Sequence, residues 1–374
     1  DPNGEGDGGI AWYSIALAVD QEDENLIYAG CVNHWKSADA GQNWTISAHW
    51  YGANGLPYVH ADNHTLVVNP LNNKCYSGND GGFYVTDDKG VDWTDLSDGL
   101  SILQIYRMGS SLTNPDLILE GSQDNGTYRY NGGTWYSVRG GDGMECAIDP
   151  IDEFTRYSTT QSGGLARSIN NGGWTNIRPS DKGAWITPFE ISRLNHNIVV
   201  AGYEKVYLSS NFGTDWVAIS EELAAGGNMN EVTMAPSDDR YIYVSSGSTL
   251  WMTADRGENW DKISDPLPNL TIEYITVAQS EPSKVWVSLS GYSAGEKIFF
   301  SEDAGQSWTN YSEGLPNVPV NCITYKNNSN YSLYAGTDLG VYYRNAELEE
   351  WVAFDDGLPN VIVNEMEVNY KINK

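Results

Sequence analysis

A tryptophan returns eight times along the 374-residue chain, each time at the end of a turn-like segment that contains Gly or Asn. Successive copies stand 39 to 49 residues apart, at Trp44, Trp93, Trp135, Trp174, Trp216, Trp260, Trp308 and Trp351. The best copies read Ser/Thr-x-Asp/Asn-x-Gly-x-x-Trp, and those ending at Trp135, Trp174 and Trp351 are degenerate. A period of this size is typical of a repeat architecture, so it constrains the fold before any local propensity does.

Each repeat also contains short runs of β-branched and aromatic residues, such as residues 13–19 and 26–30, bounded by Gly, Asn, Asp and Pro. Runs of this kind indicate strands joined by turns. Four strands in about 40 to 45 residues form the blade of a β-propeller. We therefore predict an all-β fold, a β-propeller of about eight four-stranded blades in a single domain over residues 1–374. A seven-bladed ring or part of a larger propeller is the alternative. Residues 221–225 are the only helical candidate, and they are too short to stand alone.

The turn before each tryptophan has a structural role that its residue types explain. The side chain of Asp or Asn accepts backbone N–H bonds, and Gly supplies a positive φ. The tryptophan buries an apolar face between neighbouring blades while its N–H finds an acceptor. We assign this structural role to Asp39, Asp88, Asn170, Asn211, Asp255 and Asp303.

This motif resembles the Asp-box, or bacterial neuraminidase repeat. In that family the Asp-box is a structural turn on the face away from the ligand site. The resemblance covers nearly the whole chain and implies that these turn residues carry no catalysis.

The overall charge limits the partners that the chain can bind. Asp and Glu number 50 against 21 Lys and Arg, which gives a net charge of −29. Such a surface repels nucleic acid and anionic membranes, so we expect neither as a partner. The acidity is spread along a chain rich in Trp and Tyr, which argues against disorder. It is consistent with a solvated, salt-tolerant surface or with a calcium-loaded extracellular protein.

The two ends and the cysteines give further expectations. The chain starts at Asp1 without a signal peptide or a membrane-spanning apolar stretch, so we interpret it as a mature or excised segment of a larger secreted protein. Residues 361–374 resemble the first strand of a further unit, completed by other sequence or paired with the first unit. The four cysteines lack metal-like spacing, so we expect buried thiols, with a Cys31–Cys322 disulfide as the alternative.

Candidate ligand-binding residues lie in the loops on the face opposite the tryptophan turns. Because blade strands run up and down, the loops between strands two and three share a face with the loops that enter the next blade. Polar clusters break the repeat pattern in these loops of the second to fifth units. The predicted binding face comprises His60, Asp62, His64, Asn79, Asp80, Gln123, Asp124, Asn125, Asp142, Glu145 and Trp185.

Several kinds of chemistry fit these loops. Carboxylates, amides and backbone carbonyls suit calcium, and the His-x-Asp-x-His pattern of residues 60–64 suits a softer metal. We name calcium as the possible cofactor, at Asp62, Asp80, Asp124 and Asp142. The competing interpretation is that Asp-Gly and Asn-Gly pairs are ordinary hairpin turns and that the histidines bond to backbone.

The cluster sequences resemble large secreted Asp-box propeller proteins. Those proteins are widespread in Bacteroidota and are often exported by type IX secretion. The blades are also similar to the sortilin-type propeller and to the xyloglucan-degrading glycoside hydrolases of family 74. The resemblance implies a secreted or cell-surface protein that adjoins flanking domains of the same polypeptide, with a protein or glycan at the cell surface as partner.

Three functions remain open at this point. The first is a non-enzymatic binding, adhesion or structural module, which we favour because no catalytic set is identifiable. The second is a glycoside hydrolase that uses pairs among the same four aspartates, with Trp50, Tyr51 and Trp185 stacking on sugar rings. The third is a scaffold stabilised by metal. A sialidase is disfavoured, because the chain has no Phe-Arg-Ile-Pro-type segment.

Overall fold

The computed structural model describes residues 10–328 and 330–370 and contains eight four-stranded antiparallel sheets. In every sheet the four strands follow one another in chain order, each paired with the next. Apart from one short 3-10 helix, η1 (Ala53–Gly55), the described residues hold only strands, turns and loops. The predicted all-β fold of eight four-stranded propeller blades is thereby confirmed.

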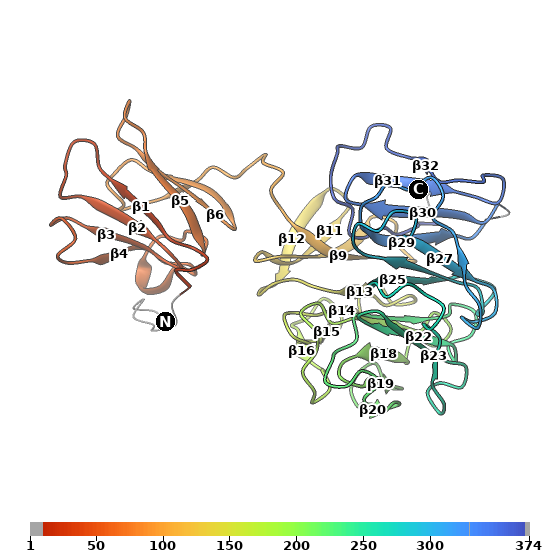
Figure 1. The fold of residues 1–374 in the computed structure, drawn as a ribbon. Coiled ribbons are helices and arrows are strands. Elements are labelled where there is room, and N and C mark those ends of the chain that lie inside the picture. The colour runs from red at the N-terminus through yellow and green to blue at the C-terminus, as the bar shows by residue number, and fades with distance from the viewer. Residues whose placement is uncertain (1–9, 329, 371–374) are drawn as a thin grey trace. The chain divides into compact units, whose positions relative to one another are not determined.

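The chain divides into two compact units, Asp1–Leu103 (unit 1) and Gln104–Lys374 (unit 2). The single domain over residues 1–374 stays a prediction. Unit 1 contains two sheets (Figure 1), made of β1 (Ala16–Val19), β2 (Ile27–Gly30), β3 (His34–Ser37) and β4 (Thr45–Ala48), then β5 (Asn63–Val68), β6 (Cys75–Asn79), β7 (Gly82–Thr86) and β8 (Thr94–Asp95).

Unit 2 contains the other six sheets. Its first three sheets are β9 (Ile105–Ser110), β10 (Leu117–Ser122), β11 (Gly126–Asn131) and β12 (Thr134–Arg139); β13 (Cys146–Ile148), β14 (Arg156–Ser158), β15 (Ala166–Ser168) and β16 (Thr175–Asn176); and β17 (Phe189–Ile191), β18 (Val199–Gly202), β19 (Val206–Ser209) and β20 (Val217–Ala218). Its last three are β21 (Glu231–Met234), β22 (Ile242–Ser246), β23 (Thr249–Thr253) and β24 (Asp261–Lys262); β25 (Ile272–Val277), β26 (Val285–Leu289), β27 (Ile298–Ser301) and β28 (Thr309–Asn310); and β29 (Val320–Lys326), β30 (Ser332–Thr337), β31 (Gly340–Arg344) and β32 (Val352–Ala353).

The tryptophan turns join the third and fourth strands of their sheets. In the turn before Trp260, the Thr253 hydroxyl donates to Asp255 at 2.6 Å, and the N–H of Gly257 donates back to Thr253 at 2.9 Å. The same two bonds occur in the turns at Asp39, Asn211 and Asp303, where Ser replaces Thr. In the turn at Asp88 they are made by Thr86. The shortened turn at Asn170 differs, because the Ser168 hydroxyl donates to the carbonyl of Gly172 instead.

Six of the repeated indoles connect their sheet to the preceding one. Each indole N–H donates to an oxygen in, or just after, the fourth strand of that preceding sheet, over 2.5 to 3.1 Å, in the pairs Trp93–Ser47, Trp174–Val138, Trp216–Ile177, Trp260–Ile219, Trp308–Ile263 and Trp351–Tyr311. The first tryptophan of each unit differs. Trp44 donates to Gly41 in its own turn, and Trp135 is 49% exposed with no indole hydrogen bond to the described residues.

The apolar core lies between neighbouring sheets. One cluster packs Tyr243 and Met252 of the β21–β24 sheet against Ile275 and Val287 of the next sheet. The expectation for the cysteines agrees with this packing. All four thiols are free; Cys75, Cys146 and Cys322 are buried as expected, whereas Cys31 is only partly buried. The alternative Cys31–Cys322 disulfide would join the two units and stays a prediction.

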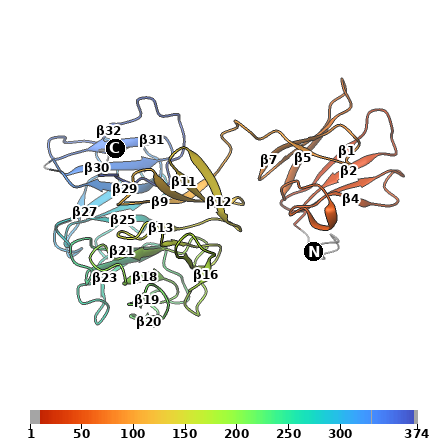
Figure 2. The same cartoon turned by 180° about the vertical axis from the view of Figure 1, so that it is seen from behind.

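The segment of residues 361–370 closes unit 2 between its last and first sheets (Figures 1 and 2). The Val363 N–H donates to the carbonyl of Thr337 at 3.0 Å, on the side of the last sheet. On the side of the first sheet, the Asn364 amide donates to the carbonyl of Ile105 at 3.1 Å, and the Ser110 N–H donates to Glu367 at 2.9 Å.

The prediction of a strand over residues 361–374 is therefore wrong for residues 361–370, which form no strand; residues 371–374 lie outside the described residues. The physical reason is the kind of bond that the segment makes. Its contacts with both neighbouring sheets run largely through side chains, and no described strand pairs with its backbone in a ladder.

Candidate functional site

The loop face of unit 1 carries a hydrogen-bonded chain of three side chains. Asp80 lies in the turn between β6 and β7, and His64 lies on β5. His64 Nε2 is 2.7 Å from Asp80 Oδ1, and the Tyr13 hydroxyl donates to Asp80 Oδ2 at 2.8 Å. The Tyr13 and His64 rings meet edge to face, with centroids 4.9 Å apart. Both oxygens of Asp80 are thus engaged, and its carboxylate is held in one orientation.

Asp62 is the second carboxylate of this face. Its backbone has a φ of 61°, and one of its oxygens lies within 4.8 Å of an oxygen of Asp80. Burial, followed by the nearby negative charge of Asp80, raises the pKa of Asp62 above its ordinary value. Its Oδ1 atom is buried without a hydrogen-bond partner among the described residues. Such an atom is costly unless a ligand, an ion or water satisfies it.

His60 and Asn79 shape the loops around these carboxylates. The backbone of Gly81 passes close beneath His60, because a Cβ at position 81 would lie 2.1 Å from the His60 Cγ. The Gly81 N–H donates to the Asn79 side-chain oxygen at 3.1 Å. These contacts explain the Asn-Asp-Gly-Gly sequence, since any side chain at position 81 would displace the imidazole.

Exposed aromatic side chains gather on the same loop face of unit 1. Trp12 is 86% exposed, and its ring centroid lies 5.9 Å from that of Tyr13, which is itself bonded to Asp80. In the loop between β4 and β5, Trp50 and Tyr51 are both exposed and pack edge to face, with centroids 4.7 Å apart. The strand order places this loop and the residues before β1 at the same end of the sheets.

In unit 2 the predicted residue Asp142 is hydrogen-bonded to neighbouring loops. It lies in the loop between β12 and β13 and is buried. It accepts the N–H of Asp124, from the β10–β11 turn, at 2.6 Å, and its other oxygen accepts the side-chain amide of Gln161. The carboxylate of Asp142 therefore fixes two loops and is not directed at solvent.

A second chain of polar contacts joins Trp185 to the β10–β11 turn. The indole N–H of Trp185 donates to the Tyr106 hydroxyl at 3.4 Å, and that hydroxyl donates to Gln123 at 2.8 Å. Asn125 donates to the backbone of Gln123 at 2.8 Å. Trp185 stays 53% exposed, so its ring is a fixed aromatic surface.

Glu145, also predicted for this face, lies instead against the interior of unit 2. Its carboxylate is 3.5 Å from the Nε atom of Arg107, which is equally close to Glu365. Further glutamates line the same interior: Glu190, Glu231, Glu365 and Glu367. Sequence reasoning missed these four because no motif marks them. Three of the five glutamates, Glu145, Glu190 and Glu231, stand on or next to an innermost strand. That position was the available signal, and the other two lie in the closing segment.

The comparisons with known proteins support the architecture. Residues 204–356, less than half of the chain, match the family described as Sortilin, neurotensin receptor 3. The blades thus resemble the sortilin type, as the sequence indicated. No curated protein sequence matches the chain.

Solved structures extend the similarity at low identity. The β-propeller domain of Myceliophteria thermophila Cps50 (Swd1) is 14% identical, with a TM-score of 0.50 over 73% of this chain and 92% of that chain. A family 74 glycoside hydrolase of Niastella koreensis is 13% identical, with a TM-score of 0.32 over 92% of this chain and 70% of that chain. The family 74 xyloglucanase of Xanthomonas campestris is 12% identical, with a TM-score of 0.36 over 90% and 70%. At these identities the Cps50 likeness shows the propeller fold alone.

Within the described part of the chain, no helix has the length and apolarity needed to cross a membrane.

Proposed function

We propose that this chain is a secreted or cell-surface binding module whose unit 1 holds an uncharged glycan without hydrolysing it. The observation that carries the proposal is Tyr13. Its ring is exposed beside Trp12, and its hydroxyl is bonded to Asp80, which in turn contacts His64. An apolar aromatic surface thus adjoins fixed polar groups.

This combination suits a sugar ring because of its two kinds of surface. The C–H face of a pyranose packs on an aromatic ring, and its hydroxyls donate to carboxylates and accept from imidazole or phenol groups. Trp50 and Tyr51 offer a second stacking surface in the β4–β5 loop. The glycan is expected to be uncharged, since Asp62, Asp80 and the net charge of −29 disfavour anions.

We also propose calcium as a cofactor of this face. Asp62 and Asp80 offer hard oxygen ligands within 4.8 Å of each other, and Asp62 Oδ1 is buried without a partner among the described residues. Both features fit the oxygen coordination that calcium prefers. A bound calcium ion would satisfy the orphaned oxygen and offset the repulsion between the two carboxylates.

A glycan array probed with the full chain tests the proposal. We expect binding to uncharged glycans, and a loss of about tenfold or more when Tyr13→Ala removes the ring. The matched control is Trp44→Ala, which truncates an exposed aromatic side chain in a tryptophan turn and should leave binding unchanged. Adding a calcium chelator should weaken binding. Equal binding by the Tyr13→Ala chain, or capture of a protein but no glycan, would contradict the proposal.

One observation favours a hydrolase as the second candidate. Asp62 has a raised pKa and lies close to Asp80, and retaining glycosidases place two carboxyl groups about 5 Å apart with one of them protonated. Against this role, both oxygens of Asp80 are already hydrogen-bonded. Release of reducing sugar by the wild-type chain, lost in Asp62→Asn, would establish hydrolysis and overturn the binding-only proposal.

A further inference from the structure

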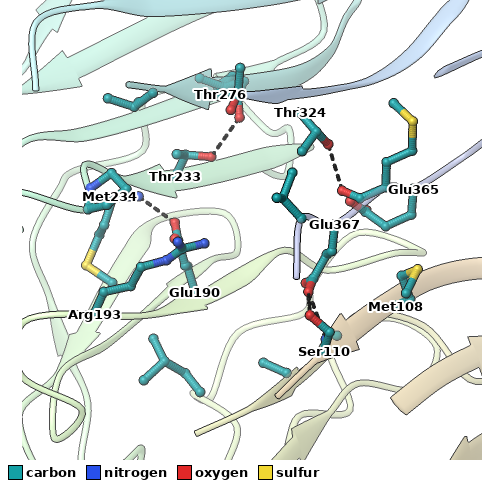
Figure 3. Close-up of a pocket in the computed structure, with 18 of the residues that line it drawn as sticks. Met108, Ser110, Glu190, Arg193, Thr233, Met234, Thr276, Thr324, Glu365 and Glu367 are labelled. Atoms are coloured by element: carbon teal, nitrogen blue, oxygen red, sulfur yellow. Dashed lines mark hydrogen bonds between the residues drawn. The ribbon is translucent and has the colours of Figure 1, made fainter. Parts of the chain in front are cut away.

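A cavity of about 230 Å³ lies at the centre of unit 2. The innermost strands of its sheets and residues 365–368 and 370 of the closing segment form the walls. Along these strands, alternate residues face the same side. Figure 3 shows Glu190 on one wall and Glu365 and Glu367 on another, with Thr233, Thr276 and Thr324 between them.

The cavity holds more carboxylates than cations. The five glutamates on its walls are Glu145, Glu190, Glu231, Glu365 and Glu367. Their basic neighbours are Arg193, which lines the cavity, and Arg107, which pairs with Glu145 and Glu365 at 3.5 Å. If all are ionised, five negative charges face two positive ones. Burying unpaired charge is costly, so such a set must bind protons or a cation.

The remaining carboxylates differ in how far the protein satisfies them. Glu190 accepts the N–H of Met234 at 2.6 Å, and Glu367 accepts bonds from the N–H and hydroxyl of Ser110. Glu231, by contrast, makes no hydrogen bond or ion pair with any described residue, although it is only 7% exposed. Arg107 supplies an opposite charge nearby, but the carboxylate of Glu231 lacks the direct hydrogen bonds that buried charges normally make.

The walls also indicate what kind of cation fits. Among the described residues, no three of these glutamates bring carboxylate oxygens within 4.8 Å of one another, so they do not form a compact set of metal ligands. Met108, Met234 and Ile323 add apolar surface beside the carboxylates. The volume lies below the roughly 300–1,000 Å³ of sites for drug-sized ligands. A short alkyl chain that ends in a cationic group matches both the charge and the size.

We infer that this cavity is a binding site for a small organic cation, whose ammonium group pairs with Glu231 while its alkyl chain contacts the methionine and isoleucine side chains. The threonine hydroxyls of β21, β25 and β29 offer further acceptors. The site is separate from the proposed glycan face of unit 1, so either proposal can fail while the other stands.

The acid–base properties of the walls set the pH at which the cation binds. Burial raises the pKa of Glu190 to about 7 and also raises the pKa values of Glu145, Glu231, Glu365 and Glu367. The other charged or titratable groups that face them are Arg107, Arg193, Tyr274, Cys322, Cys146, Tyr325 and Tyr370. An alkylammonium stays protonated up to a pH near 10. Its affinity should therefore rise between pH 6 and 8.5, as the glutamates ionise.

Isothermal titration of the full chain with n-butylammonium, compared with uncharged n-butanol, tests the inference. At pH 8.5 we expect heat from the amine and none from the alcohol. Glu231→Gln keeps the shape and removes the charge, so affinity for the amine should fall about 30-fold or more. Glu221→Gln, on an exposed loop of the same unit, is the control and should bind as wild type.

The results divide cleanly. Equal affinity of wild type and the Glu231→Gln chain for the amine would overturn the inference, as would titration of calcium but not of the amine. A melting curve of the Glu231→Gln chain checks folding, and Glu190→Gln replaces it if the first variant does not fold. A short peptide with a central lysine separates the two sources of the ammonium group. Binding of the amine alone indicates a free small molecule, whereas binding of both indicates a lysine side chain of a partner.

Discussion

Glu231 and Asp255 belong to the same sheet but hold their carboxylates in opposite environments. Asp255, in the exposed turn between β23 and β24, accepts bonds from Thr253 and from the backbone and side chain of Asn259, and the bond from Thr253 is first among the causes that lower its pKa to about 2. Glu231, on innermost strand β21, is buried without a hydrogen bond to the described residues, and burial raises its pKa.

The difference separates structure from candidate function. The carboxylate that the repeat reproduces in sheet after sheet is satisfied by its own turn and needs no ligand. The glutamates of the cavity break the repeat, because other sheets carry Thr or Tyr near the same wall positions, as at Thr276 and Tyr274. In this chain, departure from the repeat is the better guide to a site.

The pH dependence of stability should sharpen this comparison most. The folded-state pKa of Glu190, about 7, lies above its ordinary value of 4.5. The stabilisation that this group contributes is therefore fully present below pH 4.5 and is lost as the pH rises through 7. We expect the free energy of unfolding to fall by about 3 kcal/mol from this residue alone between pH 4.5 and 8, and Glu190→Gln to remove that part.

Denaturant unfolding of both chains at pH 4.5 and 8 measures the effect. The pH dependence of stability that comes from Asp255 has the opposite sign. Its pKa is lowered, so its stabilisation is present above pH 3.8 and is lost as the pH falls through about 2. An unchanged pH profile in the Glu190→Gln chain would show that the cavity carboxylates do not titrate as buried groups.

The next largest effect on stability is expected from the indoles at the ends of the turns. Trp260→Phe removes the donor to the carbonyl of Ile219, which then loses its partner. We expect a loss of about 2 kcal/mol in the free energy of unfolding. Trp135→Phe is the matched control, because the Trp135 indole makes no hydrogen bond to the described residues, and its effect should stay within about 0.5 kcal/mol. Equal losses in the two variants would remove the distinction between connected and unconnected indoles.

The smallest effect is expected from Asp255→Asn. Asn211 occupies the same turn position in the preceding sheet and makes the equivalent bonds to Ser209 and Asp215. An amide therefore suffices there, and the melting temperature of Asp255→Asn should stay near that of the wild type, whereas Asp255→Ala should melt earlier. A drop as large in Asn as in Ala would show that the charge of the turn carboxylate matters, contrary to the comparison.

The fold could be predicted from the sequence because one residue type, tryptophan, recurs at a defined place in every sheet. The spacing of Trp44 to Trp351 indicated the number of sheets. The turns at Asp39 and Asp303 could be predicted because their hydrogen bonds join residues of the same turn. The behaviour of residues 361–370 could not be predicted in this way. It depends on side-chain bonds to two sheets far apart in sequence, such as that of Glu367 to Ser110.

The candidate sites were accessible to sequence reasoning to different degrees. Loop order suggested that His64 and Asp80 lie on one face. The bond from Tyr13 to Asp80 could not be predicted, because Tyr13 lies outside any motif. Tyr106, which links Trp185 to Gln123, is likewise a strand residue without a signature. The cavity glutamates required the register of six sheets, because Glu145 and Glu231 become neighbours only around a closed ring.

The closing segment has a consequence for the order of events during synthesis. Ser110 and Glu367 are 257 residues apart. At a synthesis rate of about 5–20 residues per second, roughly 10 to 50 s pass between synthesis of the first wall of the cavity and synthesis of the last. Over that interval the sheets of unit 2 can stack in order, each on its predecessor, while the inner edge of β9 stays open. Ring completion is then the last step in the assembly of unit 2, and a cation that needs the completed cavity can be loaded only after it.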